Sequence, residues 1–199
     1  MTVGINAPPA AGGDGVCSAR MSYYVRKAQR ADQPRLEQLI ADSARTLGTH
    51  AYRSEQIEAA LRGAFGVDTQ LIDDGTYFVA ELDGVIVGCG GWSRRSTLFG
   101  GDRHAQRDAR ELNPQTDAAR IRAFFVAPEY ARQGIGRALL MNCEIAAQAQ
   151  GFTRFELMGT LTGVPFYRAL GYEAGEMVRY PATPDVMIEF VPMRKTIDQ

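Results

Sequence analysis

Residues 124–139 read FFVAPEYARQGIGRAL, and this segment is the strongest indication of the fold. A β-rich run ends at Val126, and Pro128 prevents it from continuing as a central strand. Gly134 then opens a helix whose apolar residues recur at helical spacing as far as Gln150. A strand that passes through a short turn into a long helix is typical of a mixed α/β domain.

The opening of this helix is suited to bind an anion. The first turn of a helix has unpaired N–H groups and about half a positive charge, so it holds a phosphate well. Gly134 and Gly136 carry no Cβ that would keep a ligand from the backbone, and Arg132 and Arg137 add donors. A dinucleotide fingerprint is excluded because Leu139 stands where its third glycine belongs, and no P-loop ending follows.

The same stretch resembles the acetyl-CoA loop of the GNAT superfamily of N-acetyltransferases. The likeness rests on VAPEYARQGIGRAL at 126–139 and on FYRALGY at 166–172, and it extends loosely over 22–193. It implies acetyl-CoA as co-substrate, with the pantetheine along the strand and the pyrophosphate on backbone N–H groups of the turn. The residues that it assigns to the coenzyme are Phe125, Val126, Arg132, Gln133, Gly134, Ile135, Gly136, Arg137, Ala138 and Thr160.

Three positions depart from the family pattern. Ala131 stands where the family usually has Gln or Arg, which matters little because the backbone does most of the phosphate binding. Thr160 replaces the usual Asn and keeps a polar side chain. Arg120 replaces an acidic residue often found on the central strand, which removes the usual candidate for the base.

The resemblance also places a general acid at Tyr167. A phenol of pKa about 10 can protonate a thiolate whose conjugate acid has a pKa near 8.5, if it is held against the sulfur. The alternative is that Tyr167 only packs. A backbone N–H freed by a bulge near Val126 is expected to stabilise the oxyanion, typically by about 3 kcal/mol.

No side chain is assigned as the base. The candidates are carboxylates on the expected hairpin, loop and strand, and each is more typical of a solvated surface group. They are Glu81, Asp83, Glu129 and Glu156. A water chain to bulk solvent would also serve.

Outward from the central unit, the sequence predicts one domain over residues 22–195. Its strands are expected near 23–27, 77–82, 85–88, 121–126, 155–158 and 186–191, with Asp83-Gly84 as a type I′ turn. Helices are expected after Asp32 and Ser54, over 134–150 and over 165–170. The fold class is therefore α/β, a twisted mixed sheet of six to seven strands with helices on both faces.

Two segments lie outside this regular pattern. Residues 1–21 are rich in Gly, Ala and Pro and lack the features of a secretory signal, so we expect a disordered tail. Residues 94–117 form an insertion that is either functional or mobile. Arg94, Arg95 and Arg103 could meet an acidic acceptor or the 3′-phosphate of the coenzyme, although a solvated loop is the simpler interpretation, and His104 is expected to be inert.

Several other side chains are expected to be structural. Trp92 could wall the acceptor pocket, but a core position is favoured. Cys89 and Cys143 have the character of small buried apolar residues. With three cysteines and two histidines in the chain, a metal site is not expected.

Composition limits the partners. The net charge is −1, so neither nucleic acid nor an anionic membrane is an expected partner, and no apolar run approaches the roughly 18 residues of a membrane span. The unpaired cysteines favour the cytoplasm. The acceptor is expected to be the amine of a small molecule or a peptide, and a homodimer is compatible with the resemblance.

Three functional hypotheses remain open at this stage. The first is an active N-acetyltransferase, which Tyr167 favours. The second is a non-catalytic acyl-CoA sensor or interaction domain, which Arg120 favours slightly. The third is a transferase that uses a longer acyl donor or an oxygen acceptor.

Overall fold

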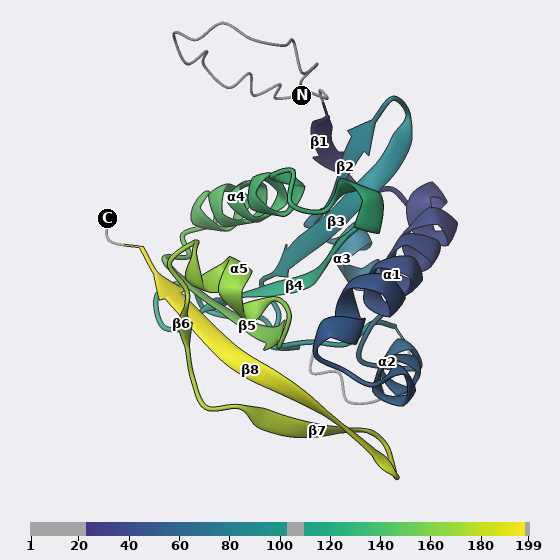
Figure 1. The fold of residues 1–199 in the computed structure, drawn as a ribbon. Helices are drawn as coiled ribbons and strands as arrows, with labels where there is room; N and C mark the ends of the chain where they lie inside the picture. Colours follow the sequence, from purple (N-terminus) through teal and green to yellow (C-terminus); the bar gives the residue numbers. More distant parts are fainter. Residues whose placement is uncertain (1–22, 103–109, 198–199) are drawn as a thin grey trace, which may run out of the picture.

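The computed structural model describes residues 23–102 and 110–197 (Figure 1). The expected tail at 1–21, and Arg103 and His104 of the insertion, lie outside this range. The strands are β1 (Tyr24–Lys27), β2 (Tyr77–Leu82), β3 (Val85–Ser93), β4 (Ala119–Val126), β5 (Arg154–Thr160), β6 (Glu173–Ala174), β7 (Val178–Thr183) and β8 (Val186–Thr196). The helices are α1 (Gln33–Leu47), α2 (Ser54–Leu61), α3 (Thr69–Asp73), α4 (Ile135–Gln148) and α5 (Val164–Arg168).

The strands form a single mixed sheet in the order β1-β2-β3-β4-β5-β8-β6, with β7 paired to β8. All neighbours are antiparallel except β4 and β5, which are parallel. Side chains of a strand alternate between the two faces, and β2 shows this clearly. Phe78 and Ala80 belong to the core beneath α4, whereas Tyr77 and Val79 belong to the core beneath α1 and α2. Helices therefore cover both faces, as predicted.

Within the described residues the sheet has eight strands, so the predicted number of six to seven is too low, because neither β6 nor β7 was predicted. β6 has two residues, too few to show an alternating pattern. β7 contains Pro181, which is tolerated because β7 lies at an edge. β8 also continues through Pro192 to Thr196, beyond the predicted end at 191, and the Pro192 carbonyl accepts a hydrogen bond from Gly175 N at 2.8 Å.

The hairpin between β2 and β3 turns at Asp83 and Gly84. Their φ angles are 49° and 79°, so both residues are left-handed as a type I′ turn requires. This prediction is confirmed. Asp32 and Ser54 do mark the starts of α1 and α2, but neither side chain caps its helix. Asp32 instead accepts a hydrogen bond from Gln29 N at 2.7 Å and pairs with Arg26.

The described ends of the insertion are ordered against the domain. Arg95 forms an isolated antiparallel bridge with Glu111, and Leu112 is buried. The Arg95 guanidinium binds both carboxylate oxygens of Asp74, at 2.8 and 3.0 Å. Arg94 lies 3.7 Å from the same carboxylate. Both arginines therefore anchor the insertion to the segment after α3, and neither lines the cavity described below.

The remaining structural predictions hold. Trp92 is 1% exposed and packs edge-on against Phe152, with ring centroids 6.0 Å apart. It belongs to the core and not to a pocket wall. Cys89 and Cys143 are buried free thiols.

Candidate functional site

A β-bulge interrupts β4 at Ala123 and Phe124. The pairing of β4 with β3 shifts at this point, so that both residues lie opposite Gly90. A Cβ on Gly90 would come within 2.7 Å of the Phe124 ring, so glycine leaves the space that this ring fills. A bulge leaves the extra residue unpaired. The bulge predicted near Val126 is confirmed, and it lies two to three residues before that position.

The carbonyl of Ala123 is held by two buried side chains. Ala123 has a φ of 56°, in the left-handed region that a non-glycine residue rarely adopts. The Tyr77 hydroxyl donates to the Ala123 oxygen at 3.3 Å, and Cys89 Sγ lies 3.8 Å from the same atom. These contacts fix the strained backbone from the side opposite α4.

β4 and β5 pair only where they begin. Ala119 lies opposite Phe155 and Arg120 opposite Glu156, and the register goes no further. The side chains of Arg120 and Glu156 form an ion pair across this junction, and Arg194 adds a contact to Glu156 at 3.1 Å. Arg120 and Glu156 therefore join the two strands at the closed end of the gap.

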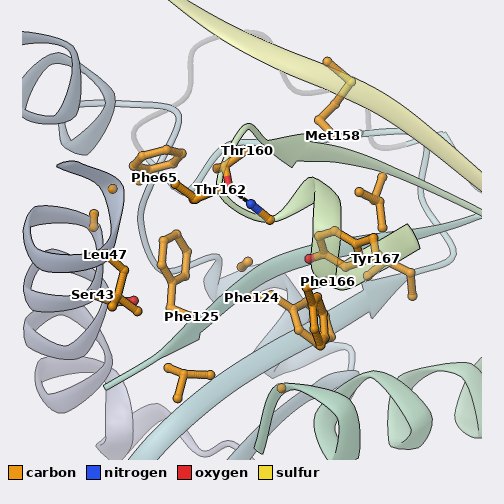
Figure 2. A pocket seen from close by; sticks show the side chains of 18 of the residues that line it. Ser43, Leu47, Phe65, Phe124, Phe125, Met158, Thr160, Thr162, Phe166 and Tyr167 are labelled. Carbon is orange, nitrogen blue, oxygen red and sulfur yellow. Dashed lines mark hydrogen bonds between the residues drawn. The ribbon is translucent and has the colours of Figure 1, made fainter. Parts of the chain in front are cut away.

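Beyond that junction, a cavity of about 830 Å³ occupies the gap between β4 and β5. Every residue from Ile121 to Val126 lines it, so the free edge of β4 forms one of its walls. Figure 2 shows two groups of side chains across this space: Ser43, Leu47, Phe65 and Phe125 on one side, and Phe124, Phe166 and Tyr167 on the other. The cavity crosses the sheet, so ligands can approach β4 from either face.

The start of α4 opens into this cavity. The backbone N–H groups of residues 132–137 form no hydrogen bond with another described residue, and the first bond is from Ala138 N to Gly134 O at 3.0 Å. Arg132 and Gly134 have φ angles of 65° and 85°. Left-handed residues next to a helix start direct successive N–H groups into one concavity, which is an anion-binding arrangement. The side-chain amide of Gln133 donates to the Glu129 carbonyl at 3.2 Å, and Gln133 does not line the cavity.

Two arginines flank the open helix start. Arg132 and Arg137 are exposed, both line the cavity, and neither forms an ion pair with a described carboxylate. Their positive charge is therefore available to an anion. Gly136 has a packing role as well, because a Cβ there would lie 3.3 Å from the Phe166 ring. Glycine at this position allows α5 to pack against the start of α4.

Most of the residues assigned to the coenzyme come together at this cavity. The ones that line it are Phe125, Val126, Arg132, Gly134, Ile135, Gly136, Arg137 and Thr160. Gln133 and Ala138 do not line it. The Phe125 side chain points away from α4 and packs edge-on against Phe65, with centroids 5.7 Å apart. Phe125 can therefore contribute to the α4 side only through its backbone.

Thr160 lies where β5 ends. Its hydroxyl oxygen accepts a hydrogen bond from Gly163 N at 3.2 Å and lies 3.2 Å from the Thr162 hydroxyl (Figure 2). The side chain thus shapes the turn from β5 into α5 while it lines the cavity.

Tyr167 projects from α5 into the cavity (Figure 2). It is 8% exposed, and its ring packs edge-on against Phe124, Phe166 and Tyr172, with centroids 6.4, 4.9 and 5.7 Å away. Burial raises the pKa of its hydroxyl well above the ordinary value, because an ionised phenolate would lose its hydration. The group is therefore a proton donor throughout the neutral pH range.

No carboxylate within residues 23–102 and 110–197 lines the cavity. Glu81 binds Tyr24 and Arg26, and the pKa of Glu81 is lowered by those hydrogen bonds. Asp83 and Glu129 are exposed. With Glu156 held by two arginines, all four carboxylates considered as bases are surface or structural groups.

Sequence reasoning missed the cavity wall on the α1 side. It is made by His50, Tyr52, Phe65, Phe99, Met158 and Phe190, together with smaller residues. These residues come from five separate segments, and no local motif connects them. The one available signal was the apolar character of Phe65 and Phe99 beside glycine in otherwise irregular segments.

The described part of the chain contains no group of three or more His, Cys, Asp or Glu residues placed to hold a metal ion. Within the same part, no helix has the length and apolar character needed to span a bilayer.

Comparison with known families supports an acyltransferase. The chain belongs to the Acetyltransferase (GNAT) family, whose model matches residues 34–172. No curated protein matches the sequence significantly.

Solved structures share the fold. A GCN5-related N-acetyltransferase from Rhodopseudomonas palustris is 20% identical with a TM-score of 0.66, covering 93% of this chain and 100% of its own. A PaiA N-acetyltransferase from Thermoplasma acidophilum, solved in complex with coenzyme A, is 18% identical with a TM-score of 0.61. The match covers 89% of this chain and 100% of the Thermoplasma chain. At these identities the likeness establishes the fold alone.

Proposed function

We propose that this protein transfers an acetyl group from acetyl-CoA to the primary amine of a small molecule or a peptide, by direct attack on the thioester. One observation carries the proposal: the free N–H groups at the start of α4 open into the same cavity as Tyr167. An anion-binding helix start can hold the co-substrate, and a buried proton donor can protonate the departing thiolate.

In the proposed binding mode, the diphosphate of the co-substrate occupies the concavity at residues 132–137. Arg132 and Arg137 supply charged donors at its rim. The pantetheine arm lies along the free edge of β4, past Val126 towards the bulge at Ala123 and Phe124. A backbone N–H on that edge faces the thioester oxygen, and one such donor is worth about 3 kcal/mol in the transition state.

In the reaction, the neutral amine attacks the thioester carbon, and a C–N bond forms as the carbonyl oxygen takes up negative charge. Collapse of this intermediate breaks the C–S bond. Tyr167 donates its proton to the departing sulfur and is reprotonated from solvent, while the nitrogen releases its extra proton to water. The apolar surroundings that raise the pKa of Tyr167 make it a weaker acid, but they also disfavour a thiolate beside it and so make the departing sulfur a stronger base.

The test combines binding with turnover. Acetyl-CoA at a hundred times its Kd is expected to stabilise the protein by about 2.7 kcal/mol, seen as a rise in the melting temperature. Release of free thiol should then depend on an added amine, and the rate should rise with pH because alkyl amines of pKa about 10 become neutral. Tyr167 does not oppose this trend, since its raised pKa keeps it protonated.

A second candidate is a non-catalytic acyl-CoA sensor, which the absence of a carboxylate among the described lining residues favours. It predicts the same thermal stabilisation with no thiol release from any amine. Amine-dependent release of thiol excludes it.

We also propose a cytoplasmic location, which the free buried thiols of Cys89 and Cys143 support.

A further inference from the structure

The α1 side of the cavity is walled by aromatic rings from distant parts of the chain. Phe65 follows α2, Phe99 lies in the insertion, Phe125 is on β4 and Phe190 is on β8, and all four line the cavity. Centroid distances are 5.7 Å for Phe65–Phe125, 6.2 Å for Phe65–Phe190 and 5.5 Å for Phe99–Phe190. Tyr180 does not line the cavity, and its ring packs against Phe99 with centroids 4.9 Å apart.

Most of these rings meet edge to face. The interplanar angles are 73° for Phe65–Phe125, 75° for Phe65–Phe190 and 89° for Phe99–Tyr180. In this geometry the edge of one ring covers the face of the next. An aromatic cage for a cation needs open faces turned towards the ligand. The cluster therefore presents an apolar wall and not a cation-binding cage.

Two of the polar side chains on the same side, those of Tyr52 and Arg122, are already engaged. The Tyr52 hydroxyl donates to the Glu189 carbonyl at 2.6 Å and accepts from Leu161 N at 2.8 Å. The Arg122 guanidinium contacts the Asp68 carboxylate at 2.6 Å and donates to the Gly100 carbonyl at 2.5 Å. No carboxylate among the described lining residues offers a counter-charge to a second ammonium group on a ligand, and the Arg122 guanidinium is itself positive.

We infer that the acceptor is an amine carried on an aromatic or branched apolar group, which packs against the wall of Phe65, Phe99 and Phe190 while the amine faces β4. This inference rests on the proposed function and names its substrate class. A polyamine is a poor ligand for this wall, because its second charge would leave water without a partner. An arylalkylamine brings apolar surface that the wall removes from water.

The experiment uses the full chain saturated with coenzyme A, and measures by calorimetry the Kd of 2-phenylethylamine and of 1,4-diaminobutane. The first is expected to bind at least tenfold more tightly. Replacing Phe65 with leucine should weaken binding of 2-phenylethylamine about fivefold, because one ring of the wall is lost. The control is Phe78→Leu, which removes a ring that is also 8% exposed but lies outside the cavity.

The outcomes separate this inference from the proposed function. Equal or tighter binding of 1,4-diaminobutane overturns the substrate class, as does an equal loss in Phe65→Leu and Phe78→Leu. Thiol release from acetyl-CoA with either amine is measured in parallel. Preferred binding of 2-phenylethylamine without any thiol release upholds the ligand class and contradicts the transfer reaction.

Discussion

Replacing Tyr167 with phenylalanine is expected to lower kcat about a hundredfold while leaving the Kd of acetyl-CoA unchanged. A positioned acid typically contributes a factor of about 10²–10⁴, and the raised pKa of Tyr167 puts its contribution towards the lower end. The ring contacts to Phe124 and Phe166 survive in the variant, so only the proton donor is lost. Steady-state release of thiol, with acetyl-CoA binding measured separately, checks the prediction.

Tyr172→Phe is the matched control. Tyr172 is also buried, but its hydroxyl donates to Glu144 at 2.9 Å and lies outside the cavity. This variant should lose about 1 kcal/mol of stability, as expected for one buried hydrogen bond, with kcat unaltered. If Tyr167→Phe turns over at the native rate, or if both variants slow equally, Tyr167 is not the acid.

Gly134→Ala is expected to weaken acetyl-CoA binding about ten- to thirtyfold. Gly134 has a φ of 85°, and its Cβ would meet nothing closer than the Tyr23 hydroxyl at 3.8 Å, so the penalty is conformational and not steric. A left-handed alanine costs about 1–2 kcal/mol. Without ligand, the turn of the variant can relax and avoid this cost. Acetyl-CoA binds only to the original turn, so part of its binding free energy is spent on restoring that turn. Calorimetry of acetyl-CoA binding gives the change directly.

The control for this variant lies at the other end of the same helix. Gly151 follows α4 with a φ of 89°, and its replacement by alanine imposes a similar strain far from the cavity. Gly151→Ala should lower the melting temperature and leave the affinity unchanged. An unaltered Kd in Gly134→Ala would show that the turn does not hold the ligand.

Local signals account for the parts of the structure that the sequence predicted. The strand that ends at Val126, the turn and α4 form one continuous segment, so Pro128 and Gly134 mark its boundaries without help from the rest of the chain. Asp83-Gly84 likewise specifies its hairpin through backbone conformation alone. Tyr167 was placed by the resemblance, and the structure brings it to the same cavity as the helix start.

Features that depend on distant residues were not predictable. The wall of Phe65, Phe99 and Phe190 comes from three segments that meet only when the sheet folds. The partner of Arg120 was not predictable either. In the sequence Arg120 departs from the family pattern on the central strand, and in the fold it pairs with Glu156. A single sequence shows which residues are apolar or charged, but it does not show which of them become neighbours.

The assignment of coenzyme A to this site depends on the N–H groups of residues 132–137, which would hold its diphosphate. The most direct measurement is a titration of ¹⁵N-labelled protein with acetyl-CoA, followed through the backbone amide signals. The amides of residues 132–137 should shift together and saturate, whereas pantetheine, which lacks the diphosphate, should leave them in place. Failure of acetyl-CoA to bind at millimolar concentration, or binding that leaves these amides unmoved, would contradict the assignment.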